Sequence, residues 1–83
     1  MDIVILDSAY KHGITEESIY SCLFNFKGDK LLDYPPVKRL FAGFDNNRTA
    51  LELVGIEDLE RNRLVIFHAM KLQKKYYYLL RGD

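Results

Sequence analysis

Three β-prone segments joined by two short polar turns constrain the fold of this chain more than any other feature. The segments cover residues 37–44, 49–57 and 63–69, and residues 45–48 and 58–62 separate them. The connecting residues are rich in Asp, Asn and Arg, and turns this short join antiparallel neighbours. The pattern therefore predicts an antiparallel meander in the second half of the chain.

The first half of the chain predicts one further strand and two helices. Residues 1–6 are a short β-prone run, and Asp7 or Ser8 can cap a brief helix that ends before Gly13. Thr15 is the N-cap candidate of a second helix, because two glutamates follow it where the positive helix end favours them. The apolar face of this helix is expected to consist of Ile19, Cys22, Leu23 and Phe26.

Two prolines and a last periodic segment define the remaining elements. Residues 30–34 indicate a short strand or extended segment, and Pro35 and Pro36 place it at a sheet edge because proline cannot donate to a ladder. Residues 70–81 predict a closing helix. The expected fold class is α+β in two layers: a small antiparallel sheet of three to four strands, with two N-terminal helices and one C-terminal helix on one face, in a single domain of residues 1–83.

The composition narrows the class of protein. Apolar residues make up 48% and charged residues 29% of the chain, which is typical of globular domains. No apolar run approaches the roughly 20 residues that span a bilayer, and a single cysteine allows no internal disulfide, so we expect a cytoplasmic protein without membrane contact. Two histidines and one cysteine are too few for a structural zinc site, and glycine-rich phosphate or dinucleotide motifs are absent. No metal and no cofactor is expected.

The charges balance overall but are unevenly distributed. Twelve basic and twelve acidic residues give a net charge of zero, which argues against a surface that is positive throughout. Residues 71–81 nevertheless carry four cations and no acid, whereas residues 57–60 carry three acids. A local basic patch is sufficient to hold a phosphate group, because salt limits exposed charges to about 8–10 Å of reach.

Basic and imidazole side chains form the candidate catalytic set. We expect Lys11, His12, Arg39, His68 and Lys71 to converge near one edge of the sheet. Cleaving RNA without a metal needs a base for the 2′-hydroxyl proton, an acid for the leaving 5′-oxygen and cations for the charge on phosphorus. Histidine suits either proton role because its unperturbed pKa is about 6.5.

The closing segment adds a candidate RNA-binding surface. It consists of Lys74, Lys75, Tyr77 and Tyr78. Lysines attract phosphate, and one of the two tyrosines is free to stack on a base.

Each of these residues also has a structural interpretation. His12 can satisfy the last carbonyls of a helix, and His68 can be a hydrogen-bonded core residue. Arg39 can be a surface residue of a strand, and the lysines of residues 71–75 can form a solvated helix face. The sequence leaves both interpretations open.

Taken together, the order of these features resembles the BrnT-like toxins of bacterial type II toxin–antitoxin systems, which are small ribonucleases related to the RelE fold. Lys11-His12-Gly13-Ile14-Thr15-Glu16-Glu17 looks like the family's K-H-G-[IV]-[ST]-x-E segment, and Arg39-Leu40-Phe41-Ala42-Gly43-Phe44-Asp45 is similar to its R-x-x-x-G strand. Ile66-Phe67-His68-Ala69-Met70, followed by Lys74 and Tyr77, occupies the place of the family's I-S-A-R segment and E-x-x-Y helix.

The chain departs from this pattern where the family keeps an arginine and an acid. Met70 stands at the arginine, and Lys74 stands at the acidic position of the last helix. The resemblance implies a metal-independent endoribonuclease toxin that acts on RNA and is held in check by a cognate antitoxin. The lost arginine also motivates an alternative: a non-catalytic interaction module that binds a partner peptide at the edge segment of residues 30–36, or pairs there with itself as a homodimer.

Overall fold

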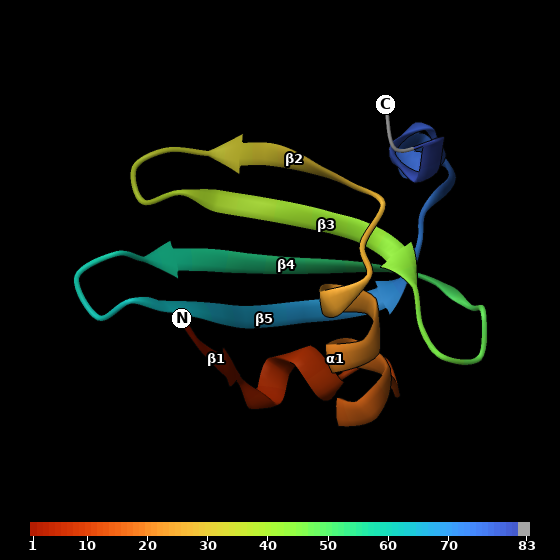
Figure 1. The fold of residues 1–83 in the computed structure, drawn as a ribbon, viewed down its shortest axis with the longest axis horizontal. Coiled ribbons are helices and arrows are strands. Elements are labelled where there is room, and N and C mark those ends of the chain that lie inside the picture. The colour runs from red at the N-terminus through yellow and green to blue at the C-terminus, as the bar shows by residue number, and fades with distance from the viewer. Residues whose placement is uncertain (82–83) are drawn as a thin grey trace.

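The chain forms a mixed five-stranded sheet in the computed structural model, which describes residues 1–81. In spatial order the strands are β1 (Asp2–Ile5), β5 (Arg63–Lys71), β4 (Ala50–Asp58), β3 (Lys38–Phe44) and β2 (Gly28–Asp33), as Figure 1 shows. The helical elements are the short 3₁₀ helix η1 (Asp7–Tyr10), the α-helix α1 (Glu16–Phe24) and the 3₁₀ helix η2 (Lys74–Arg81). Strands β2, β3, β4 and β5 pair antiparallel with one another in that order, whereas β1 pairs parallel with β5.

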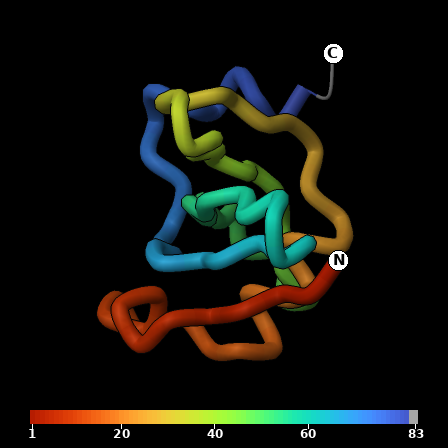
Figure 2. The backbone as a smooth tube through the Cα atoms, turned by 90° about the vertical axis from the view of Figure 1, so that its left-hand side faces the viewer, coloured from red at the N-terminus to blue at the C-terminus, as the bar shows by residue number. Residues whose placement is uncertain are grey.

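Each face of the sheet carries its own core. On the face covered by α1, here the α1 face, the buried residues include Ile19, Cys22, Leu23, Phe41, Leu51, Leu53, Leu64, Ile66 and Ala69. On the opposite face, here the η2 face, Leu40, Ala42, Val54 and Leu72 are buried against partly buried residues that include Tyr76, Leu79 and Leu80 of η2. Figure 2 shows the N-terminal segment beside β5 at one side of the molecule and the C-terminal segment near β2 at the other. The N-terminal and C-terminal segments therefore lie at opposite edges of the sheet.

Helix α1 begins where its cap residue predicts. The Thr15 hydroxyl accepts a hydrogen bond from the Ser18 backbone N–H at 3.1 Å, which satisfies one of the free donors at the helix start. Ile19 and Cys22 have no exposed surface, and Leu23 is almost fully buried. The predicted N-cap and these three predicted apolar residues are confirmed, whereas the fourth, Phe26, lies beyond the end of α1 and is 41% exposed.

The predicted sheet of three to four antiparallel strands is wrong because β1 adds a parallel strand. Asp2 to Ile5 align with Arg63 to Ile66, and Ile3 and Ile5 pack against the core of the α1 face. The pairing joins segments from opposite ends of the chain, so local sequence patterns do not record it. With β2 also in the sheet, the strand count is five.

The predicted set of three helices on one face is also wrong. The first predicted helix is a single 3₁₀ turn of four residues, because so short a segment cannot repay the cost of helix nucleation. The closing helix begins at Lys74 rather than Met70, since Met70 and Lys71 continue the ladder with β4 and the Leu72 N–H donates to the Ala50 carbonyl at 2.9 Å. It is a 3₁₀ helix, and it lies on the face opposite α1.

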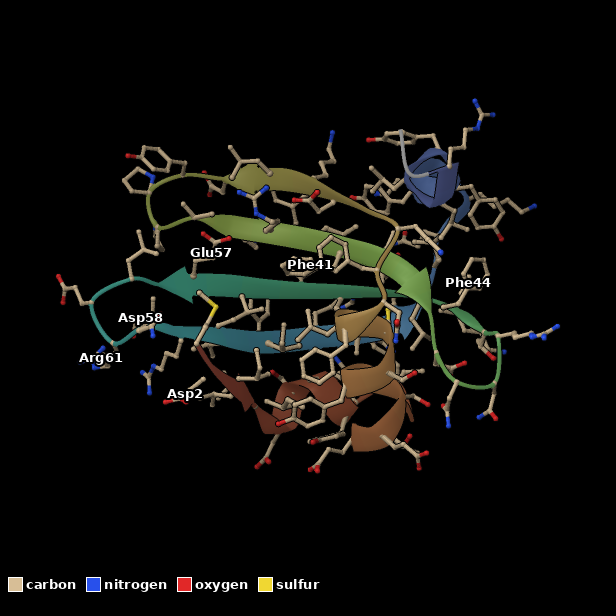
Figure 3. The ribbon with its side chains drawn as sticks, viewed as in Figure 1. Asp2, Phe41, Phe44, Glu57, Asp58 and Arg61 are labelled. Carbon is tan, nitrogen blue, oxygen red and sulfur yellow. The ribbon has the colours of Figure 1, made fainter. Side chains whose placement is uncertain are left out.

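The turn between β4 and β5 lies at the end of the sheet opposite Phe44, as Figure 3 shows for Asp58 and Arg61. The Asp58 carboxylate accepts hydrogen bonds from Arg61 Nη1 at 3.1 Å and Arg63 Nε at 3.0 Å. The hydrogen bond from the Arg61 side chain is the main cause that lowers the pKa of Asp58. These contacts stabilise the turn that the polar residues predict.

Among residues 1–81, none of the helices has the length and apolar character needed to cross a bilayer.

Candidate active site

Two histidines from distant parts of the chain meet at one cavity on the η2 face. The ring centroids of His12 and His68 lie 5.7 Å apart, edge to face, with an interplanar angle of 75°. The cavity has a volume of about 390 Å³. It is lined by Ser8, Lys11, His12, Leu32, Lys38, Val54, Phe67 and His68. It combines two imidazoles and two ammonium groups with apolar side chains.

A β-bulge in β5 brings His68 to this cavity. Gly55 pairs with Ile66, but the preceding Val54 pairs with His68, so Phe67 is an extra residue in β5. Cross-strand partners share a face, and Val54 belongs to the core of the η2 face. The bulge therefore places the His68 and Phe67 side chains on the same side of the sheet.

The turn after η1 brings Lys11 and His12 to the same place. The Ser8 hydroxyl donates to the Phe67 carbonyl at 2.8 Å, which ties η1 to the bulge in the neighbouring strand. The Gly13 N–H donates to the Tyr10 carbonyl at 3.1 Å, and Gly13 has a φ of +80°, a conformation that favours glycine. The chain thus turns immediately after His12 and leaves the imidazole exposed at the cavity.

A buried carboxylate in the neighbouring strand contacts the His68 imidazole. Glu52 in β4 is only 2% exposed, and its Oε2 lies 3.1 Å from Nε2 of His68. Gln73 donates to the same carboxylate twice, through its backbone N–H to Oε1 at 2.9 Å and through its side-chain amide to Oε2 at 3.0 Å. Hydrogen bonds are what make a buried carboxylate tolerable, so Glu52 is a well-satisfied anchor for the imidazole.

Lys38 is a cation of the cavity that sequence reasoning did not select. Its Nζ lies 5.5 Å from the centroid of the Phe67 ring, in cation–π geometry. Glu52 was missed as well. The signal for Glu52 was an acid at a strand position between apolar residues, because a carboxylate there must find a buried partner. Lys38 had no such signal, since alternating polar residues are ordinary in strands.

Arg39 lies on the α1 face, away from the two histidines. It alternates with Leu40 and shares a face with Phe41, and its guanidinium binds Asp29 at 2.7 Å and Glu57 at 3.2 Å. Partial burial alone would lower the pKa of Arg39, but the hydrogen bonds to the two carboxylates outweigh it and raise the pKa. Arg39 therefore acts as a clamp between three strands.

Lys71 is also outside the cavity. It is the register partner of Leu51, whose side chain is buried in the core of the α1 face, so Lys71 points to that side of the sheet. The expected convergence therefore brings together Lys11, His12 and His68 but leaves out Arg39 and Lys71.

The candidate RNA-binding residues of the closing segment lie on η2, which packs against β2 and β3. Lys74, Lys75, Tyr77 and Tyr78 are exposed, and none of them lines the cavity. The Lys75 ammonium lies 5.1 Å from the centroid of the Tyr76 ring. Contact of these residues with RNA stays a prediction.

In the part of the chain that the structure describes, no group of three or more His, Cys, Asp or Glu side chains is placed to hold a metal ion. The chemistry available to the cavity is acid–base chemistry by imidazole, with cations that stabilise an anion.

Neither protein-family models, nor curated proteins, nor solved structures show a match to this chain.

Proposed function

We propose that this protein is an endoribonuclease toxin that cleaves RNA by proton transfer between His12, His68 and the RNA. The observation that carries the proposal is the 5.7 Å apposition of the two imidazoles at one open cavity. The toxin setting and its cognate antitoxin rest on the sequence resemblance to BrnT-like proteins. The cleavage chemistry rests on the cavity.

In the proposed reaction one imidazole removes the proton from the 2′-hydroxyl next to the scissile phosphate. The 2′-oxygen attacks phosphorus, the bond from phosphorus to the 5′-oxygen breaks, and the second histidine, as imidazolium, donates a proton to that oxygen. The products are a 2′,3′-cyclic phosphate and a 5′-hydroxyl. Two histidines are sufficient for both proton transfers because an imidazole can act as a base and an imidazolium as an acid.

Lys11 and Lys38 supply the positive charge that this reaction needs. Both line the cavity with the histidines, and phosphorus gains negative charge as the 2′-oxygen attacks. In the resembled family an arginine stands where this chain has Met70. The two lysines therefore supply the cationic role from other parts of the fold, the turn after η1 and strand β3.

The test is cleavage of a labelled single-stranded RNA by the purified protein. His12→Ala and His68→Ala should each lower the rate by about 10²- to 10⁴-fold, and RNA with 2′-deoxyribose at every position should stay intact. Lys27→Ala is the matched control, because Lys27 is an exposed cation outside the cavity. Full activity in both histidine variants, or products that carry a 5′-phosphate, would exclude this mechanism. Growth arrest on induction, relieved by the histidine substitutions, tests the toxin setting.

An interaction module is the second candidate, and a groove at the far end of the sheet favours it. The groove has a volume of about 500 Å³ and lies between the β2–β3 and β4–β5 turns. Tyr34 and Leu59 line it with exposed fractions of 69% and 72%. Under this alternative the purified chain cleaves no RNA and binds a partner peptide or a second copy there. Tyr34→Ala and Leu59→Ala should then abolish co-purification or dimerisation, as measured by light scattering.

A further inference from the structure

The Glu52–His68 contact resembles the arrangement in which a carboxylate selects one tautomer of a catalytic imidazole. A neutral imidazole carries one proton, and the ring nitrogen that faces a carboxylate is the one that keeps it. Nε2 of His68 lies 3.1 Å from Oε2 of Glu52, so Nε2–H is the donor in this contact. Nδ1 is then the unprotonated nitrogen, and its lone pair can accept a proton from a substrate hydroxyl.

The surroundings of Glu52 hold its carboxylate against the His68 ring. The carboxylate is 2% exposed, and both of its oxygens already accept hydrogen bonds from Gln73. Each donor from Gln73 holds an oxygen in place, so the carboxylate cannot rotate away from His68 without losing buried hydrogen bonds. Glu52 itself does not line the cavity, which separates it from the groups that would touch RNA.

His12 has no comparable anchor. It follows η1 on an exposed turn, and no hydrogen bond of its ring with another residue of the described chain is present. The two imidazoles thus differ in how they are held. The Glu52 carboxylate orients His68, whereas His12 is free to turn toward a bound group.

We infer that Glu52 is a positioning residue that keeps His68 as the Nε2–H tautomer, which makes His68 the general base and leaves His12 as the general acid. This inference rests on the proposed ribonuclease function, but the tautomer of His68 can be measured without RNA. Gln73 contributes indirectly by holding the Glu52 carboxylate.

The experiment is long-range ¹H–¹⁵N NMR of the two histidine rings, recorded at a pH where the imidazoles are neutral. The wild-type protein should show His68 protonated at Nε2. In Glu52→Gln the amide nitrogen can take the place of Oε2 and donate to the ring, and the side-chain amide of Gln73 can turn to present its oxygen. His68 should then be protonated at Nδ1.

Two variants serve as controls. Glu57→Gln removes a carboxylate from the same strand but on the α1 face, where it binds Arg39. Gln73→Ala removes the side-chain hydrogen bond to Glu52 but keeps the one from the Gln73 backbone N–H, and a carboxylate oxygen still faces His68. Both should keep His68 protonated at Nε2. A merely structural role of Glu52 would change the stability of the fold but would not exchange the protonated nitrogen.

The cleavage assay then separates this inference from the proposed function. If the wild type cleaves RNA, Glu52→Gln should lower the rate by about 10²- to 10⁴-fold with the fold intact, and an unchanged rate would overturn the positioning role. If the wild type cleaves no RNA, the proposed function fails, while the NMR spectra still decide the tautomer. Protonation of wild-type His68 at Nδ1, or no exchange in Glu52→Gln, would overturn the inference directly.

Discussion

The polar side chains of this chain act through the partners that the fold gives them. Arg39 and Lys38 are neighbours in β3, yet one clamps Asp29 and Glu57 on the α1 face and the other lines the cavity on the η2 face. The period of two in a strand is the whole reason for the difference. Residue type alone could not have distinguished their roles.

Cys22 shows the opposite case, in which residue type and helical spacing are enough to predict the environment of the side chain. The sequence predicts a buried, apolar role, and the side chain has no exposed surface. Burial raises the pKa of Cys22 from 9.0 to about 12, with a smaller contribution from Asp45. The thiol is therefore kept protonated and out of contact with reagents in the folded protein.

We predict that Cys22 reacts with a thiol reagent at pH 8 only as fast as the protein unfolds. Because the pKa of Cys22 is higher in the folded than in the unfolded chain, its contribution to stability is complete below pH 9 and is lost as the pH rises toward 12. Between pH 8 and pH 10 the free energy of unfolding of the wild type should fall by about 1 kcal/mol relative to Cys22→Ala. Rapid labelling of the native protein would contradict the prediction.

At the level of elements, the β-bulge in β5 is the feature that brings His68 to the cavity. If β5 were regular and Phe67 paired with Val54, the alternation from Leu64 and Ile66 would place His68 on the α1 face. The Ser8–Phe67 hydrogen bond then ties η1 to the bulge and brings His12 alongside. The cavity therefore depends on the bulge in β5 and on the hydrogen bond that ties η1 to it.

The packing of η2 depends on a glycine in β2. A Cβ at Gly28 would collide with the backbone carbonyl oxygen of Leu79, which cannot move without the helix. We predict that Gly28→Ala lowers the free energy of unfolding by about 1–3 kcal/mol and speeds amide hydrogen exchange across η2. Lys30→Ala, an exposed change in the same strand, should alter stability by less than about 0.5 kcal/mol. Equal stability and exchange in Gly28→Ala and wild type would show that η2 tolerates the displacement.

Across the molecule, a net charge of zero conceals an uneven distribution of charge that bears on the proposed binding of RNA. The cations of η2 lie near β2, and Lys11 and Lys38 line the cavity on the same face of the sheet. The acids of the β4–β5 turn lie at the far end of the sheet, where Asp58 binds Arg61 and Arg63. The η2 face is therefore the side that suits a polyanion.

We predict that RNA affinity depends on salt through four lysines of this face. Each lysine that contacts a phosphate of single-stranded RNA contributes about −0.7 to the slope of log affinity against log salt concentration. Replacing Lys11 and Lys38 by alanine should reduce the magnitude of the slope by about 1.4, and replacing Lys74 and Lys75 should have a similar effect. Lys27→Ala should leave the slope unchanged. If replacing Lys74 and Lys75 leaves the slope unchanged, as Lys27→Ala should, bound RNA does not extend beyond the cavity.

Features that depend on neighbours along the chain could be predicted from the amino-acid sequence. Thr15 caps α1 because its hydroxyl meets an N–H only three residues away, the polar turns join β3 to β4 and β4 to β5, and Pro35 and Pro36 follow a strand that lies at the sheet edge. Local propensity and periodicity contain this information because the groups involved are already close in the chain.

Features that depend on residues far apart in the chain could not be predicted in this way. The parallel pairing of β1 with β5, the strand in place of helix at Met70 and Lys71, and the opposite faces of α1 and η2 all follow from burial that no short window of sequence records. The candidate site belongs to this group. The sequence predicted His12 and His68 as candidate catalytic residues. Their apposition, and the contact of Glu52 with His68, arise from packing between the η1 segment, β4 and β5, because packing of distant segments sets which groups share a cavity.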